Sequence, residues 1–394
     1  GDFVVHIEHG IARFDGIVQV SETTGQREYL ALEYLGTDRL YVPVDQINRV
    51  QKYVGMSDQE PKLSRLGTAD WTRKKKQAQE SAQKIAAELL DIYAAREVAV
   101  GQAFGEDSPW QQPFEEGFPF IETPDQLDAI IDVKADMEQP RPMDRLIAGD
   151  VGYGKTEVAL RAVFKAAMDD KQVVVLVPTT VLAQQHHDTF STRMRDYPLT
   201  VELLSRFRTK TEQDDVIAGL ASGDVNVVIG THRLLQDDVL FNDLGLVVVD
   251  EEQRFGVQQK ERLKALRRNV DVVTLTATPI PRTLHMALSG LREISVIESP
   301  PEHRLAVKTY VTTYDDQIVA NAIRSELHRG GQVYFLHNRI QTIATWAERL
   351  RTLVPEVTLL VGHGQMSANE LEEVMYRFAR GDAQVLLSTA IIEN

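Results

Sequence analysis

The sequence predicts an α/β protein that begins with a small antiparallel β-barrel, and three observations support this fold class. Short strand-like segments separated by glycine-bearing turns fill residues 1–56, a pattern typical of small barrels. From residue 116 onward, runs of β-branched residues alternate with helical patterns, which indicates a parallel sheet covered by helices on both faces. A glycine-rich turn at residues 149–156 separates one such strand from a helix. The chain therefore combines two kinds of domain.

Composition narrows the class of protein. The chain has 394 residues, of which 43% are hydrophobic and 26% charged, which is typical of globular protein and predicts two or three domains. Its formal net charge of −15 excludes attraction of nucleic acid by net charge, so any DNA contact must be local. The absence of cysteine excludes disulfides and thiolate metal sites. No stretch approaches the ~18 apolar residues of a membrane span, so we expect a cytoplasmic protein without membrane contact.

We interpret the first domain as a binding module. Its predicted strands lie at residues 3–7, 16–20, 27–34 and 39–43. His6, Glu8 and His9 could be imagined as metal ligands, but we set a metal site aside because neighbours along a strand point to opposite faces. We expect one exposed strand edge for a partner, although the same strand could instead be paired inside the barrel. The predicted edge comprises Ile17, Val18, Gln19 and Val20.

Residues 57–115 differ in composition and predict a linker. Polar and charged residues dominate, and residues 85–93 repeat apolar residues at helical spacing, which predicts a long connecting helix. The basic run at residues 73–76 could touch phosphate, but a solvated helix face is the more common role of such a run. The domains that follow are predicted at residues 116–300 and, as an incomplete α/β unit, at residues 301–394.

The glycine-rich turn fits the spacing GxxxxGK(S/T) of a phosphate-binding loop and lies, as that motif requires, between a strand and a helix. Glycines let backbone N–H groups curl around phosphate oxygens, the helix N-terminus favours anions, and Lys155 can reach the outer phosphates. Thr156 would hold Mg²⁺. The alternative is a chance glycine turn. The predicted nucleotide-binding residues of this stretch are Gly149, Gly152, Tyr153, Gly154, Lys155, Thr156 and Glu157.

A short segment upstream of this loop carries groups that suit adenine. Thr123 and Pro124 give the next helix a capped start. The ring of Phe118 or Phe120 can stack on a base, and the Gln126 amide can both donate and accept along the edge of the base. Together with the phosphate-binding loop, these groups predict an ATP site.

A run of leucine and valine ends in Asp250 and Glu251, at the carboxyl edge where open parallel sheets bind ligands. Asp250 would position Mg²⁺ through water, and Glu251 would orient and deprotonate the attacking water. The alternative is an acidic turn in which a glutamate stabilises a helix N-terminus. The phosphate-binding loop favours the catalytic interpretation. The predicted catalytic residues are Lys155, Asp250, Glu251 and Gln253.

The loops after the other parallel strands gather at the same sheet edge and carry hydroxyl, imidazole and guanidinium groups. Such groups can bind DNA phosphates without reading the base sequence. Hydroxyls after the next strand could relay the nucleotide state to a bound DNA strand. The predicted DNA contacts are Thr179, Thr180, Arg206, Thr231, His232 and Arg233, and the predicted coupling residues are Thr276 and Thr278.

These motifs resemble those of the bacterial transcription-repair coupling factors (the Mfd family), which are superfamily-two helicase-type DNA translocases. The matching motor segments are GDVGYGKT, PTTVLAQQH, SRFRT, GTHRLLQ, DEEQRFG, TATPIPRT and GHGQM. The motor segments would fit the RecG-type helicases nearly as well, and the opening GDFVVHIEHG is what favours the coupling factors. The resemblance covers nearly the whole chain.

The resemblance implies a Tudor-like barrel at residues 1–56 that binds the β subunit of RNA polymerase, a linker at residues 57–115, a RecA-like lobe at residues 116–300 and part of a second RecA-like lobe at residues 301–394. It also implies ATP- and Mg²⁺-dependent movement on double-stranded DNA, which displaces stalled polymerase and couples transcription to nucleotide excision repair. Excision-repair proteins would bind only through regions outside this chain.

Two features depart from the family pattern. The family usually has histidine where Gln253 stands, and the chain ends at Asn394, before the family's arginine fingers. Because an arginine finger can contribute about 10³ to 10⁵ in rate, we expect weak ATP turnover from these residues alone. Two alternatives stay open, a RecG-like fork-remodelling helicase and a noncatalytic adaptor that only binds polymerase.

Overall fold

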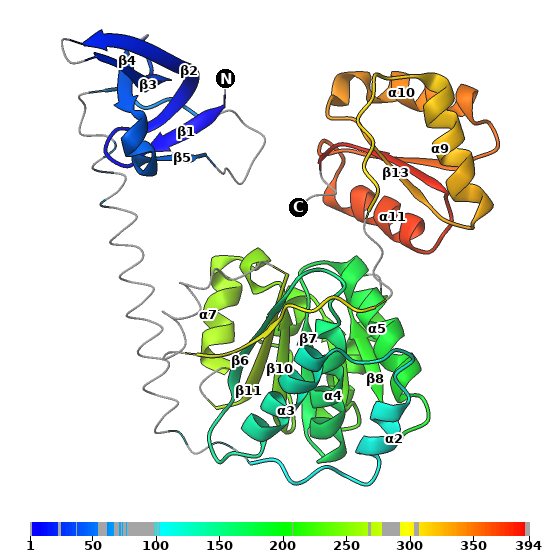
Figure 1. Ribbon diagram of the computed structural model, residues 1–394. Helices are drawn as coiled ribbons and strands as arrows, with labels where there is room; N and C mark the ends of the chain where they lie inside the picture. Colours follow the sequence, from blue (N-terminus) through cyan, green and yellow to red (C-terminus); the bar gives the residue numbers. More distant parts are fainter. Residues whose placement is uncertain are drawn as a thin grey trace. The chain divides into compact units, whose positions relative to one another are not determined.

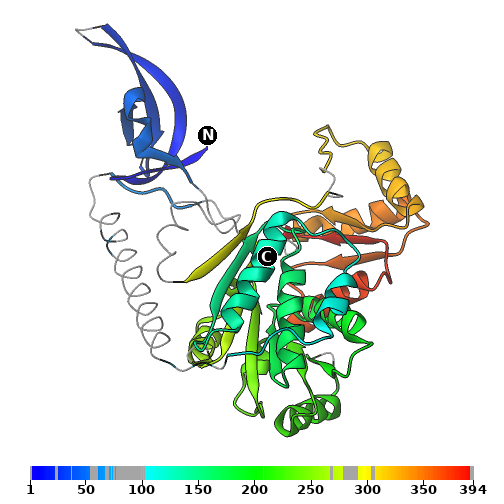
Figure 2. The ribbon, with the colours of Figure 1, turned by 60° about the horizontal axis from the view of Figure 1, so that its bottom comes forward.

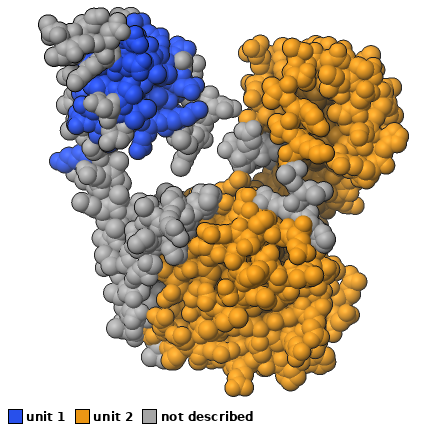
Figure 3. Space-filling model, viewed as in Figure 1, with its two compact units in different colours: residues 1–91 blue, residues 92–394 orange. Residues whose placement is uncertain are grey.

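The chain forms two compact units, residues 1–91 and residues 92–394 (Figure 3). The computed structural model describes residues 2–22, 25–36, 38–53, 61–66, 71, 73, 76, 99, 101, 103–206, 208–266, 269–277, 292–302 and 307–390. The predicted long helix of the linker, at residues 85–93, lies outside the described residues. Among the described helices, none has the length and apolar character needed to cross a bilayer.

The first unit contains an antiparallel sheet, as the sequence predicts. Its described strands follow one another in the order β4-β3-β2-β1-β5. A small core of Ala12, Leu30, Leu32, Tyr34 and Val42 lies beneath them. The elements are β1 (Phe3–His6), β2 (Gly10–Glu22), β3 (Gly25–Glu33), β4 (Arg39–Pro43), the short 3₁₀ helix η1 (Val44–Arg49) and β5 (Val50–Lys52).

The second strand of this sheet is the one predicted to offer a free edge. Along one side it pairs with β3, with Ile17 opposite Leu30 and Val18 opposite Tyr29. Along the other side, β1 pairs with residues 10–13 only, and on that side no described strand pairs with β2 beyond residue 13. Among the described strands, the predicted segment is therefore paired on one side and unpaired on the other.

The turn between β1 and β2 brings side chains together that a continuous strand would separate. The chain turns at residues 7–9, so the rings of His6 and His9 stack with their centroids 4.7 Å apart. Trp71 Nε1 donates to the carbonyl of Ile7 at 3.2 Å. A Cβ on Gly10, whose φ is +85°, would lie 2.8 Å from the Trp71 ring. Residues beyond the predicted boundary at 56 thus pack against the first sheet.

The second unit begins with a parallel sheet in the order β12-β6-β11-β10-β7-β9-β8 (Figure 1, Figure 2). Its strands are β6 (Asp144–Gly149), β7 (Gln172–Leu176), β8 (Val201–Leu204), β9 (Val227–Gly230), β10 (Leu244–Asp250), β11 (Asp271–Thr276) and β12 (Glu293–Ile297). Its helices are α2 (Gln111–Glu116), α3 (Pro124–Met137), α4 (Lys155–Met168), α5 (Thr180–Met194), α6 (Lys210–Ser222) and α7 (Val257–Leu266), with 3₁₀ helices η2 (His232–Leu235) and η3 (Glu252–Arg254).

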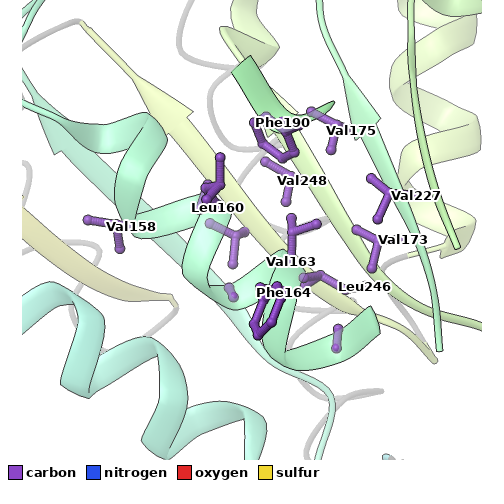
Figure 4. Close-up of a cluster of buried hydrophobic side chains, with 14 of the residues drawn as sticks. Val158, Leu160, Val163, Phe164, Val173, Val175, Phe190, Val227, Leu246 and Val248 are labelled. Atoms are coloured by element: carbon purple, nitrogen blue, oxygen red, sulfur yellow. The ribbon is translucent and has the colours of Figure 1, made fainter. Parts of the chain in front are cut away.

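Both faces of this sheet are buried, which explains its continuous β-branched runs. Val173 and Val175 face α4 and belong to a cluster that includes Val163 and Phe164 (Figure 4). Val174 lies between these two residues, so its side chain points to the other face and belongs to the cluster there. Because all the strands are parallel, the loops after their carboxyl ends meet at one edge of the sheet.

Part of the predicted linker belongs to this core. Phe104 and Phe114 are buried, and the Phe114 ring stacks on Phe164 of α4 with centroids 3.9 Å apart. The segment is also tied to α4 by charge, since Lys165 donates to the Asp107 carboxylate at 2.8 Å. Residues from 103 onward therefore support the helix that follows the phosphate-binding loop.

The remaining part of the second unit is a smaller parallel sheet in the order β13-β15-β14. Ile323, Ile343, Ala347, Leu350 and Leu387 form its core. Its elements are α9 (Asp316–His328), β13 (Val333–Leu336), α10 (Ile340–Leu353), β14 (Leu359–Gly362), α11 (Ala368–Ala379) and β15 (Val385–Ser388). The predicted class, an antiparallel sheet followed by two parallel α/β lobes, is confirmed.

Candidate functional site

The loop between β6 and α4 has the backbone that phosphate binding requires. Gly152 and Gly154 have φ values of +80° and +78°, in the left-handed region that residues with a Cβ atom rarely adopt. Gly154 is the N-cap of α4, and the helix starts at Lys155. The Lys155 ammonium donates to the carbonyls of Gly149 and Asp150 at 2.7 and 2.9 Å. The lysine thus lies over the loop, at the positive end of α4.

A cavity of about 700 Å³ opens beside this loop, a volume in the range of small-molecule sites. It brings together most of the predicted nucleotide-binding and catalytic side chains, although Gly149, Tyr153 and Gln253 are not part of its wall. The predicted residues in the wall are Phe118, Phe120, Gln126, Gly152, Gly154, Lys155, Thr156, Glu157, Asp250 and Glu251. The sequence analysis missed other wall residues, among them Ile121, Val151, Leu160, Leu182, Thr189, Leu275, Ala277, Pro301 and Glu302.

At the apolar end of the cavity, Phe118 and Phe120 meet edge to face with ring centroids 5.5 Å apart. Gln126 connects this end to the loop, because its amide nitrogen donates to the Tyr153 carbonyl at 2.8 Å. Its amide oxygen accepts from the Thr123 N–H at 3.0 Å and completes a capping box at the start of α3. The predicted cap is therefore present, and the glutamine also fixes the loop.

Glu157 lines the cavity, but its carboxylate is bound by two arginines. It accepts from Arg161 at 3.0 Å and from Arg193 of α5 at 3.1 and 3.2 Å. Both guanidinium groups also lie within 5.7 Å of the Phe118 ring centroid. The spacing of Glu157 and Arg161 at i and i+4 on a helix could have revealed this pair, which holds the aromatic wall in place.

The two carboxylates at the end of β10 are held differently. Glu251 has φ 52° and ψ 52°, and its carboxylate accepts from the Ala277 N–H at 2.9 Å and from the Gln253 amide. Asp250 Oδ2 lies 3.1 Å from Nε2 of His186 on α5. Gln253 is thus a partner of Glu251, and His186 is a partner of Asp250 that the sequence analysis missed.

Electrostatics around Lys155 suit an anion. Burial lowers the pKa of Lys155, whereas the Asp250, Glu251 and Asp150 carboxylates oppose this shift. A desolvated ammonium gains more from an ionised phosphate than an exposed one does, because the local dielectric is low. The donor set beside it also suits Mg²⁺, since the Thr156 hydroxyl and the Asp250 carboxylate are hard oxygen ligands in one cavity wall.

The predicted DNA contacts follow the carboxyl ends of β7, β8 and β9, at the same sheet edge. Thr179 caps α5, and the buried Thr180 hydroxyl has no hydrogen-bond partner among the described residues. Arg233 forms a bidentate pair with Asp238 at 2.7 and 2.6 Å, and Arg206 binds Asn369 and Glu372 of α11. Thr231 is buried, whereas His232 is exposed. These arginines would have to exchange a protein partner for a phosphate.

Of the two predicted coupling residues, Thr276 lies within the described part of the chain. Thr276 is the last residue of β11 and is buried, one residue before the Ala277 N–H that binds Glu251. Thr278 lies outside the described residues. The strand that ends at Thr276 therefore leads directly to a contact with the candidate general base.

Three family models match successive parts of the chain. They are the CarD-like/TRCF RID domain at residues 1–54, the DEAD/DEAH box helicase at residues 123–287 and the helicase conserved C-terminal domain at residues 316–394. Transcription-repair-coupling factors are similar over all 394 residues, with 55% identity for Bacillus subtilis and 52% for Staphylococcus haemolyticus. The chain spans 34% of the length of each of these relatives.

Solved structures extend the likeness to three dimensions. RecG bound to a three-way DNA junction is 25% identical with a TM-score of 0.63, and the match covers 93% of this chain and 57% of RecG. The DUF1998 helicase MrfA bound to DNA shares the fold, with 15% identity, a TM-score of 0.53, and coverage of 75% of this chain and 46% of MrfA.

Proposed function

We propose that this chain, which is similar over its whole length to transcription-repair-coupling factors, carries an ATP-driven motor that moves on double-stranded DNA and displaces stalled RNA polymerase. One observation supports the motor above all others. The phosphate-binding lysine, the Mg²⁺-type oxygen donors and a candidate general base line a single cavity at the carboxyl edge of a parallel sheet. That combination is what hydrolysis of a nucleoside triphosphate requires.

Each end of the cavity has its part in binding ATP. The adenine base would lie against the Phe118 and Phe120 rings, near the Gln126 amide. The phosphates would lie at the N-terminus of α4, where Lys155 would exchange two neutral carbonyls for ionised phosphate oxygens. The phosphate-binding loop should keep its shape when ATP binds, because the Gln126 amide donates to the Tyr153 carbonyl.

Hydrolysis follows from the carboxylates at the end of β10. Thr156 and Asp250 would hold Mg²⁺, which neutralises the charge that develops on the phosphate oxygens. Glu251 orients the attacking water and accepts its proton, while the Ala277 N–H and the Gln253 amide fix the carboxylate. Movement of β11 at Thr276 would shift Ala277 and thereby change the position of Glu251, the candidate general base.

For DNA, the proposed contacts are Thr179, Thr180, Arg206, Thr231, His232 and Arg233. We expect the affinity for double-stranded DNA to fall with salt, with a log–log slope of about −0.9 for every phosphate neutralised. Two unrelated sequences should give the same slope, because these groups bind phosphates rather than bases. Fluorescence anisotropy across a salt series measures both.

Matched arginine variants sharpen this test. Arg233→Ala should reduce the slope by about one and weaken binding to both sequences equally. Arg329 is also paired with a carboxylate, that of Glu326, but it follows α9 and leads toward the opposite, amino edge of its sheet. Arg329→Ala should therefore leave the slope unchanged. A flat salt dependence, or equal effects of the two variants, would contradict the proposed DNA face.

The first sheet would bind RNA polymerase, and its β subunit in particular, by adding a strand to the open side of β2. Ile17 is 59% exposed there, so it can contact an added strand. Ile17→Glu should weaken polymerase binding about tenfold or more, because a charge would be placed in an apolar contact. Ile47→Glu, at a similarly exposed isoleucine of η1, serves as the matched control.

Biolayer interferometry with immobilised polymerase measures this effect, and circular dichroism checks that both variants are folded. Affinity of Ile17→Glu within twofold of wild type would show that the open side of β2 is not the contact. The motor residues alone fit polymerase displacement and RecG-like fork remodelling equally well. The match of residues 1–54 to the CarD-like/TRCF RID domain favours polymerase binding.

A further inference from the structure

One helix connects the proposed DNA face with the proposed metal site. α5 (Thr180–Met194) begins beside Thr179 and runs along the cavity, where Leu182 and Thr189 are part of the wall. Residues 182, 186 and 189 recur at helical spacing, so they share one face of the helix. His186 lies between the two wall residues and points toward Asp250. The face of α5 that borders the cavity therefore carries a histidine.

The contact between His186 and Asp250 is well defined. Nε2 lies 3.1 Å from Oδ2, and the side chains are 11% and 16% exposed. An ionised carboxylate can only accept hydrogen bonds, so the histidine Nε2 must carry the hydrogen. Phe190, one turn further along α5 and 1% exposed, packs edge-on against the imidazole with ring centroids 6.0 Å apart. A core residue thus fixes the ring that binds the carboxylate.

We propose that His186 is a positioning residue, which holds the Asp250 carboxylate in the orientation that Mg²⁺ requires; this rests on the proposed nucleotide function. Metal-binding carboxylates are commonly oriented by a hydrogen bond from a second group, and removal of such a group costs about 10- to 100-fold in metal affinity. His186 and the proposed DNA contact Thr180 belong to one helix, so a displacement of α5 would act on both of them.

The neighbouring histidine provides a matched control. His187 lies on the same helix and is also largely buried, but its ring bonds to Ser191 at 3.3 Å instead of to Asp250. A general loss of helix stability should follow from either substitution. Only a loss at His186 should change the response to Mg²⁺.

The test is a titration of the 394-residue chain with a fluorescent ATP analogue, in a Mg²⁺ series and in EDTA. For His186→Ala, we expect the Mg²⁺ concentration at half-maximal effect to rise about tenfold or more, while the affinity in EDTA stays within about twofold of wild type. His186→Gln, which keeps a donor at a similar position, should restore most of the response. His187→Ala should behave as wild type.

A normal Mg²⁺ response of His186→Ala, or an equal loss of affinity in Mg²⁺ and in EDTA, would overturn the positioning role while leaving the nucleotide site intact. Failure of the wild-type chain to bind the analogue would overturn the proposed function and this role together. If the alanine variant does not fold, His186→Leu, which keeps volume without a donor, replaces it against His186→Gln. Equal responses of those two variants would again refute the role.

Discussion

Replacing Lys155 with alanine is expected to lower the affinity for ATP by about 10- to 100-fold, because one charge-assisted hydrogen bond contributes about 1.5–3 kcal/mol. The ammonium lies over the loop and is largely buried, so water cannot take its place at the phosphates. The variant also removes the lysine hydrogen bonds to the carbonyls of Gly149 and Asp150, which makes the loop less well defined. Isothermal titration calorimetry with ATP and Mg²⁺ measures the loss.

The control for this prediction is a lysine in the same lobe that lies away from the phosphate-binding loop. Lys171 binds the Asp243 carboxylate just before β7, at the amino edge of the sheet. Lys171→Ala should therefore keep the wild-type affinity for ATP. Unchanged affinity in a folded Lys155→Ala variant would remove the main support for the nucleotide site.

Replacing Glu251 with glutamine is expected to lower ATP hydrolysis by about 10²- to 10⁴-fold while ATP binding stays within a few-fold of wild type. Glutamine keeps an oxygen that can accept from the Ala277 N–H, so the loop geometry should persist. It cannot accept a proton from water, so only the chemical step should be lost. Phosphate release in the presence of double-stranded DNA reports hydrolysis, and calorimetry reports binding.

Glu252→Gln is the matched control for Glu251, because it changes the next carboxylate along the chain, which is not part of the cavity wall. Hydrolysis by Glu252→Gln should stay near the wild-type rate. If Glu251→Gln hydrolysed ATP normally, another group would have to be the base. If it lost ATP binding as well, Glu251 would be structural rather than catalytic.

Much of the motor fold could be predicted from local sequence. The spacing of Gly149, Gly154 and Lys155 predicts a phosphate-binding loop, in which Gly152 and Gly154 adopt positive φ, and flanking apolar runs identify the strand and helix around it. Because parallel strands end at a common edge, the order of the motifs along the chain was enough to predict that Asp250 and Glu251 lie near the phosphate-binding loop, and all of them line one cavity.

The contacts that were missed join residues far apart in sequence. His186 and Asp250 are 64 positions apart, and nothing in either segment alone indicates that they meet. The pairing of β2 was ambiguous for a related reason, since an edge is defined by where the neighbouring strand stops rather than by the strand itself. Phe104 and Phe114 lie in a polar stretch, so their packing in the core was not apparent from composition.

The left-handed backbone of Glu251 has an evolutionary consequence. Holding a residue with a Cβ in that region costs about 1–2 kcal/mol, whereas glycine adopts it freely and asparagine more readily than most residues. Backbone preference alone would therefore favour glycine or asparagine at this position, and neither has a carboxylate. In a lineage that no longer needed ATP hydrolysis, neutral drift should replace the glutamate. A glutamate in this strained conformation thus agrees with its proposed role as the general base.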